Sequence, residues 1–116
     1  MPLVIHQRTI DEVVILDLSG RLWILDLPLR DLMNRLLGEG KRHFVLNLNG
    51  VEYIDSSGLG QLITIWTSVR SKAGHMAIMA PTKRVQRLFE LTRLSTVFEV
   101  HDTENSAVES ARKASA

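Results

Sequence analysis

The sequence of 116 residues contains no cysteine, which excludes disulfides and metal sites built on thiolates. It also contains no apolar run near the ~18–20 residues that a membrane-spanning helix requires. The first residues lack the basic start and apolar stretch of a signal peptide. From these absences we expect a cytoplasmic domain without membrane insertion.

Aromatic residues make up only 5% of the sequence, too few for the stacking surfaces that bind single-stranded nucleic acid. The formal net charge is +1, so the chain has no global field that would attract nucleic acid or anionic lipid. Its short basic clusters, such as Lys83-Arg84 with Arg87, are interpreted as solvated faces. We therefore expect no direct binding to nucleic acid.

The sequence also lacks recognisable catalytic and nucleotide-binding motifs. Ser56 is not embedded in G-x-S-x-G, and Gly58-Leu59-Gly60 lacks the third glycine and the lysine of nucleotide-binding loops. No spacing typical of metal ligands occurs. We expect no catalysis, no metal and no cofactor. The histidines, interpreted as solvated residues at strand ends, are His6, His43, His75 and His101.

Alternating apolar segments predict an α/β fold in a single domain over residues 1–116, with the order β-β-α-β-α-β-α-β-α. This order implies a mainly parallel mixed sheet of about five strands with helices packed on it. Gly20 is expected to end the second strand. The expected strands cover residues 3–5, 13–18, 44–48, 76–80 and 97–100. The expected helices cover residues 28–38, 57–72, 82–92 and 105–114, and the first of them ends at Gly38 or Gly40.

The second of these helices carries an apolar face. Its members recur at helical spacing and are predicted to be buried, with core packing as the expected role of the tryptophan. They are Leu59, Leu62, Ile63, Trp66 and Val69.

Residues 51–60, Val-Glu-Tyr-Ile-Asp-Ser-Ser-Gly-Leu-Gly, are the most informative segment. The two serines fall at a strand-to-helix turn, where free backbone N–H groups and the positive end of the helix would stabilise a phosphate. Each glycine costs about 1 kcal/mol relative to alanine inside a helix. Two in one opening turn suggest that something needs close access to the backbone.

A second unusual feature is the apolar stretch around Trp23, in a predicted loop before the first helix. Loops usually run over the surface. Two interpretations stay open: these side chains fold over the edge of the core, or they form a contact patch for a partner.

Residues 51–60 resemble the signature of STAS domains, the anti-sigma-factor antagonists of bacterial partner-switching pathways. The similarity extends over nearly the whole chain. Further matches are an early glycine motif at residues 18–22, a central strand at 45–48 and a later helix at 85–92.

The resemblance implies a mechanism. In that family the unphosphorylated antagonist binds an anti-sigma factor, a serine kinase of the GHKL type, and so releases a sigma factor. The kinase phosphorylates the serine after the aspartate, here Ser56, and a PP2C-type phosphatase reverses the reaction. Ser57 would be a helix cap or a contact residue. The implied partner-binding residues are Asp55, Ser56, Ser57, Gly58, Leu59, Gly60, Trp23 and Asp26.

One position departs from the family. Trp23 stands where an aspartate usually follows the early Gly-x-Leu, and Asp26 is the candidate substitute. The alternative hypothesis is therefore a constitutive STAS adaptor subunit of an ABC-type lipid transport complex.

Overall fold

The computed structural model describes residues 3–22 and 28–115, which form an α/β fold around one five-stranded sheet. The strands lie in chain order across the sheet, with the first pair antiparallel and the others parallel. They are β1 (Val4–Ile10), β2 (Val13–Leu22), β3 (His43–Ile54), β4 (His75–Met79) and β5 (Glu99–His101). The helices are α1 (Pro28–Gly38), α2 (Ser56–Ser71), α3 (Lys83–Leu91), the short 3₁₀ helix η1 (Leu94–Thr96) and α4 (Glu104–Ser115).

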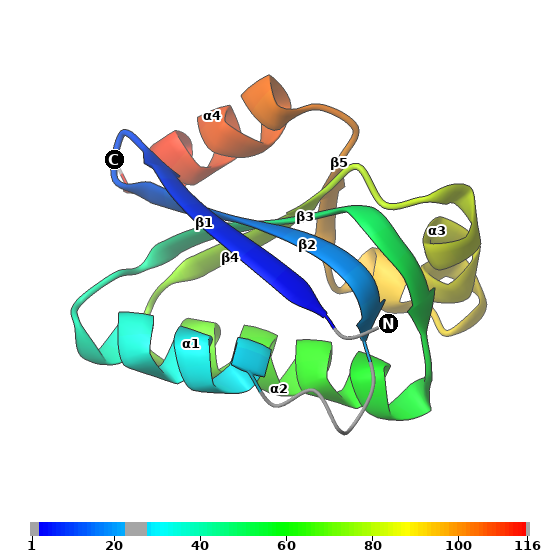
Figure 1. Ribbon diagram of the computed structural model, residues 1–116. Helices are drawn as coiled ribbons and strands as arrows, with labels where there is room; N and C mark the ends of the chain where they lie inside the picture. The colour runs from blue at the N-terminus through cyan, green and yellow to red at the C-terminus, as the bar shows by residue number, and fades with distance from the viewer. Residues whose placement is uncertain (1–2, 23–27, 116) are drawn as a thin grey trace.

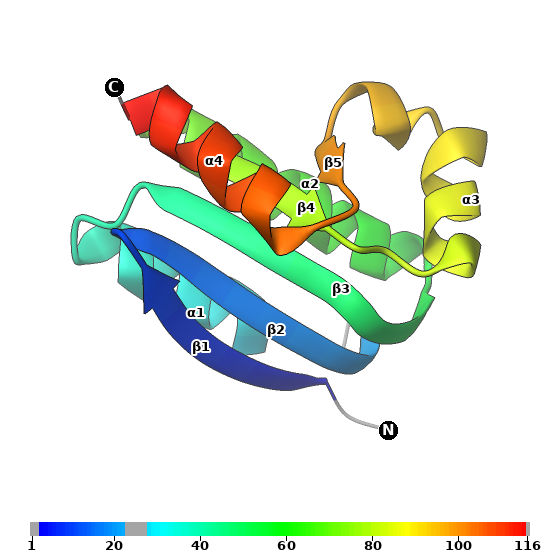
Figure 2. The same ribbon diagram turned by 90° about the horizontal axis from the view of Figure 1, so that it is seen from above.

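The helices cover both faces of the sheet. Helices α1 and α2 lie side by side on one face and α4 on the other (Figure 1). Seen from above, α3 lies beyond the end of the sheet, near β5 (Figure 2). The larger apolar cluster fills the space beneath α1 and α2, and a smaller one, which includes Ile15 and Ala107, lies under α4. The predicted fold class and element order are confirmed.

Three strands continue well beyond their predicted ends. The first of them, β1, was expected to end at residue 5 and runs to Ile10. Gly20 does not end β2, because its positive φ of 104° accompanies a register shift against β3 and the strand runs on to Leu22. Strand β3 likewise passes Leu48 and ends at Ile54. At Gly50 a Cβ would lie 2.8 Å from the Cβ of Ser19, so only glycine permits this close pairing.

The predicted buried face of α2 needs one correction. Leu59, Leu62 and Val69 are buried, and Trp66 is partly buried against the core. Ile63 is 40% exposed, so its predicted burial is wrong. Ile65 is buried instead, because it shares the face of Leu62 and Val69 that rests on the sheet. No helix within the described ranges is long and apolar enough to cross a bilayer.

Candidate functional site

Asp55 is the single residue that connects the end of β3 to the start of α2. Its backbone is extended (φ −94°, ψ −178°), and its side chain caps the helix by accepting a 2.7 Å hydrogen bond from the N–H of Gly58. The hydroxyl of Ser57 donates a 2.6 Å hydrogen bond to the same oxygen, Oδ1. These hydrogen bonds, that of Ser57 being the stronger influence, lower the pKa of Asp55 below its ordinary value. Asp55 is therefore a carboxylate at neutral pH.

Ser57 does not cap α2, so this one of its two predicted roles is wrong. Asp55 holds the cap position, and Ser57 is the second residue of the helix. Its hydroxyl is turned back to the Asp55 carboxylate. This contact orients the carboxylate and reduces the freedom of the Ser57 hydroxyl.

Ser56 is the first residue of α2 and is exposed. No hydrogen bond of its hydroxyl is found among the described residues. The hydroxyl also lies at the positive end of a 16-residue helix. Of the two serines, Ser56 is therefore the one whose oxygen is open to a reagent from solution.

The two glycines of the opening turn differ. A Cβ at Gly58 would lie 2.2 Å from the carbonyl oxygen of Leu22, so this glycine lets α2 start directly against the end of β2. A Cβ at Gly60 would meet nothing within 4 Å. Packing inside the domain therefore explains Gly58, whereas Gly60 lies on an open surface beside Ser56 in the same turn. The sequence suggested that both glycines give a partner close access to the backbone, but this explanation is not needed for Gly58.

The end of β2 completes the surroundings of the turn. The N–H of Asp55 approaches the carbonyl oxygen of Leu22 at 3.4 Å, and the Arg21 guanidinium lies 6.0 Å from the ring centroid of Tyr53. The predicted site residues Trp23 and Asp26 lie outside the described residues. The structure thus brings together Asp55, Ser56, Ser57, Gly58, Leu59 and Gly60.

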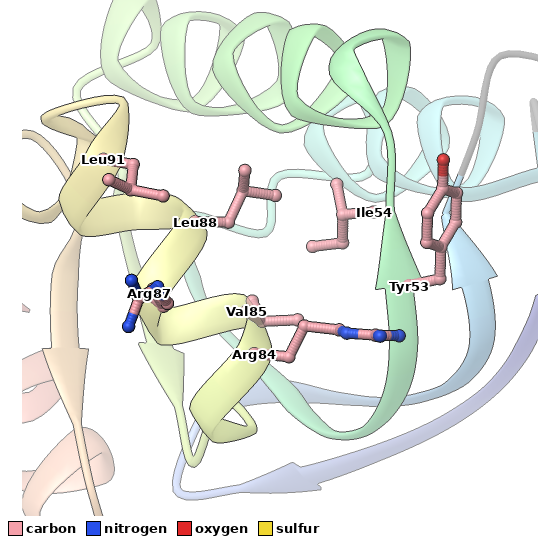
Figure 3. Close-up of a pocket in the computed structure, with 7 residues that line it drawn as sticks. All are labelled: Tyr53, Ile54, Arg84, Val85, Arg87, Leu88 and Leu91. Atoms are coloured by element: carbon pink, nitrogen blue, oxygen red, sulfur yellow. The ribbon is translucent and has the colours of Figure 1, made fainter.

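A groove that the sequence did not predict opens next to this turn. It has a volume of about 350 Å³ and lies between the end of β3 and α3. Figure 3 shows Ile54 on β3 and Leu88 on α3 facing the space between the two elements. The lining residues are Tyr53, Ile54, Arg84, Val85, Arg87, Leu88 and Leu91.

His6 is exposed, as the sequence predicted, but the other three histidines are less solvated than expected. His43, His75 and His101 are each partly buried, at the start of β3, the start of β4 and the end of β5. Glu99 lies 3.3 Å from Nε2 of His75 and 2.7 Å from Nε2 of His101. Across the described part of the chain, no three His, Asp or Glu side chains are placed to hold a metal ion.

Comparison with known proteins adds independent information. The sequence model of the STAS domain family matches residues 5–107 of this chain. A Thermotoga maritima protein named "Putative anti-sigma factor antagonist" is 32% identical over 108 residues, which cover 91% of this chain and 96% of that protein.

Solved structures agree with this match. The crystal structure of a Thermotoga maritima protein described in the same terms has a TM-score of 0.85 at 32% identity, covering 93% of this chain and 94% of the other. The Bacillus cell fate determinant SpoIIAA, in its phosphorylated form, has a TM-score of 0.72 at 19% identity and covers 91% of this chain and 97% of its own. At that identity the likeness to SpoIIAA concerns the fold alone.

Proposed function

Because this chain belongs to the STAS family of anti-sigma factor antagonists, we propose that its unphosphorylated form binds an anti-sigma factor and thereby frees a sigma factor. The anti-sigma factor is a serine kinase of the GHKL type that phosphorylates Ser56, and a PP2C-type phosphatase removes the phosphate. The family is not enzymatic, so the chain acts by binding and by being modified.

The observation that supports this proposal best is the difference in the surroundings of the two serines. The Ser57 hydroxyl is engaged with Asp55, whereas Ser56 is exposed at the first position of α2. A kinase active site can therefore reach the Ser56 oxygen without breaking the cap of the helix. Gly60, which has open space around it, removes side-chain bulk from the same turn.

Electrostatics explain how the modification would act. Unphosphorylated, the turn carries the single negative charge of Asp55, whose pKa is lowered by Ser57 and Gly58. A phosphate on Ser56 adds about −1.5 to −2 charges beside it. This charge would repel an acidic partner surface. In a tightly packed interface, the added phosphate would also disturb the packing around the former hydroxyl. The SpoIIAA structure shows that a protein of this fold exists in a phosphorylated form.

The test is phosphorylation in vitro. The chain is incubated with ATP and each purified GHKL-type anti-sigma factor of its source organism, and the products are mapped by mass spectrometry. We expect one phosphate, on Ser56, in the wild type and in Ser57→Ala, and none in Ser56→Ala. Full modification of Ser56→Ala would contradict the assignment. Absence of binding and modification with every kinase would instead favour the constitutive adaptor.

A further inference from the structure

The groove between β3 and α3 has an apolar floor and exposed apolar walls. Val85 and Ile54 are buried at its base. Leu91 is 72% exposed and Tyr53 42%, and both line the groove. Leucine and tyrosine side chains that border a concavity of this kind are typical of surfaces that are covered in a complex.

Two cations flank these apolar walls. Arg84 and Arg87 are exposed residues one turn apart on α3, and both line the groove. Neither forms an ion pair with any described residue. The lining contains no acidic side chain within the described ranges. In Figure 3 the Arg84 side chain extends from α3 toward the end of β3. The groove is thus complementary to an apolar group flanked by carboxylates.

The groove is also continuous with the site of modification. Ile54, on its β3 side, is two residues before Ser56, and Asp55 between them caps α2. A protein that covers Ser56 would therefore extend over the groove with a small addition of contact area. A separate ligand bound there would compete with that protein for the same space.

We propose that this groove receives a segment of the anti-sigma partner in which an apolar side chain is flanked by aspartate or glutamate residues. The apolar side chain enters between Ile54 and Leu88, and the carboxylates pair with Arg84 and Arg87. This inference rests on the proposed function, because it places a second contact of the same partner beside Ser56. It assigns to α3 a role in the choice of partner, which charge complementarity determines.

Because the chain contains no cysteine, a dye attached to a single introduced cysteine can report binding at one chosen position. Leu91→Cys carries a single thiol on the groove wall, to which an environment-sensitive dye is attached. The matched control is Thr9→Cys, at an exposed residue of the edge strand β1 that pairs with Val14 and so lies at the opposite end of the sheet from the groove. On addition of the anti-sigma factor that phosphorylates the chain, we expect a blue shift and gain in emission at position 91 and none at position 9.

Charge reversal tests the chemistry of the segment. Arg84→Glu and Arg87→Glu should each weaken binding of the unphosphorylated chain by at least about tenfold, whereas Lys83→Glu, on the same helix but outside the groove, should not. Circular dichroism checks that all three variants fold. If the arginine variants bind as wild type and the dye at position 91 is silent, the groove inference is wrong while the proposed function stands. If the wild type binds no anti-sigma factor, both proposals are wrong.

Discussion

The carbonyl oxygen of Leu22 lies so close to Gly58 that a Cβ on this glycine would be only 2.2 Å from it. The end of β2 and the first turn of α2 are therefore in backbone contact. The same carbonyl is 3.4 Å from the N–H of Asp55. This contact fixes the position of the turn that presents Ser56, since the strand anchors the helix at its first residues.

The contact predicts different effects for the two glycines of the turn. Gly58→Ala should lower the free energy of unfolding by about 1–3 kcal/mol, because the methyl group meets a backbone carbonyl that cannot move independently of the sheet. Gly60→Ala, in open space, should be neutral or stabilise the protein by up to about 1 kcal/mol. Denaturant unfolding of both variants measures this. Equal stability of Gly58→Ala and wild type would contradict the close packing.

The cap of α2 gives a second prediction. Asp55→Ala removes the acceptor of two hydrogen bonds, from the Gly58 N–H and the Ser57 hydroxyl. We expect the melting temperature to fall by about 4 °C or more. Ser57→Ala removes only one of these bonds and should cause a smaller fall. A larger effect of Ser57→Ala than of Asp55→Ala, measured by thermal melts followed by circular dichroism, would show that Asp55 is not the main cap.

Acid stability should depend on Asp17. Arg8 donates hydrogen bonds of 2.7 and 3.1 Å to this carboxylate and Asn47 donates one of 2.8 Å. The Arg8 contact is the largest reason why the pKa of Asp17 falls from 3.8 to about 2. Because the folded pKa is the lower one, these bonds stabilise the protein above pH ~4, and that stabilisation is lost as the pH falls to about 2.

The measurement compares wild type with Asp17→Asn. Between pH ~5 and ~2 the wild type should lose about 1–2 kcal/mol more of its free energy of unfolding, a figure reduced for partial solvent screening. Glu99 also titrates near pH 2, because hydrogen bonds from Ser110, His101 and His75 outweigh the effect of burial on its pKa. It is present in both proteins and cancels. Identical pH profiles would show that the Arg8 contact is not formed in solution.

Local patterns in the sequence predicted the order of elements and most core positions. Leu62 and Val69 lie on a face that helical spacing alone defines, and both are buried. The predicted ends of β1, β2 and β3 were wrong, because strand ends depend on pairing with other segments of the chain. Gly50 fits against Ser19 only once the two strands are paired, so its role could not be read locally.

The candidate site likewise has a part that the sequence predicted and a part that it did not. Asp55 and Ser56 were identified from a continuous motif, and their place at the start of α2 follows from local capping. The groove was missed because Tyr53 and Leu91 are far apart in the sequence and meet only in the tertiary fold. Arg84 was interpreted as part of a solvated face, which its exposure supports, but periodicity could not show that an apolar groove adjoins it.

Trp23 lies outside the described residues, and its role stays a prediction from the sequence. If it belongs to a partner patch, Trp23→Ala should lower the free energy of unfolding by less than about 1.5 kcal/mol, as for a surface side chain, and clearly reduce partner affinity. A loss of ~3–5 kcal/mol in a denaturant melt, with unchanged affinity per folded molecule, would make it a core residue.

The last prediction concerns the phosphorylated chain itself. Ser56 is exposed and the bonds of Asp55 go to Ser57 and Gly58, so a phosphate on Ser56 displaces no contact of the cap. We expect circular dichroism and melting temperature close to those of the unmodified protein, together with loss of anti-sigma factor binding in titration calorimetry. Ser56→Ala should still bind. Ser56→Asp adds one charge without the phosphate oxygens and should reproduce the loss only in part. Equal affinity of the phosphorylated and unmodified forms would mean that the modification is not a switch, since the added charge would then lie away from the bound partner.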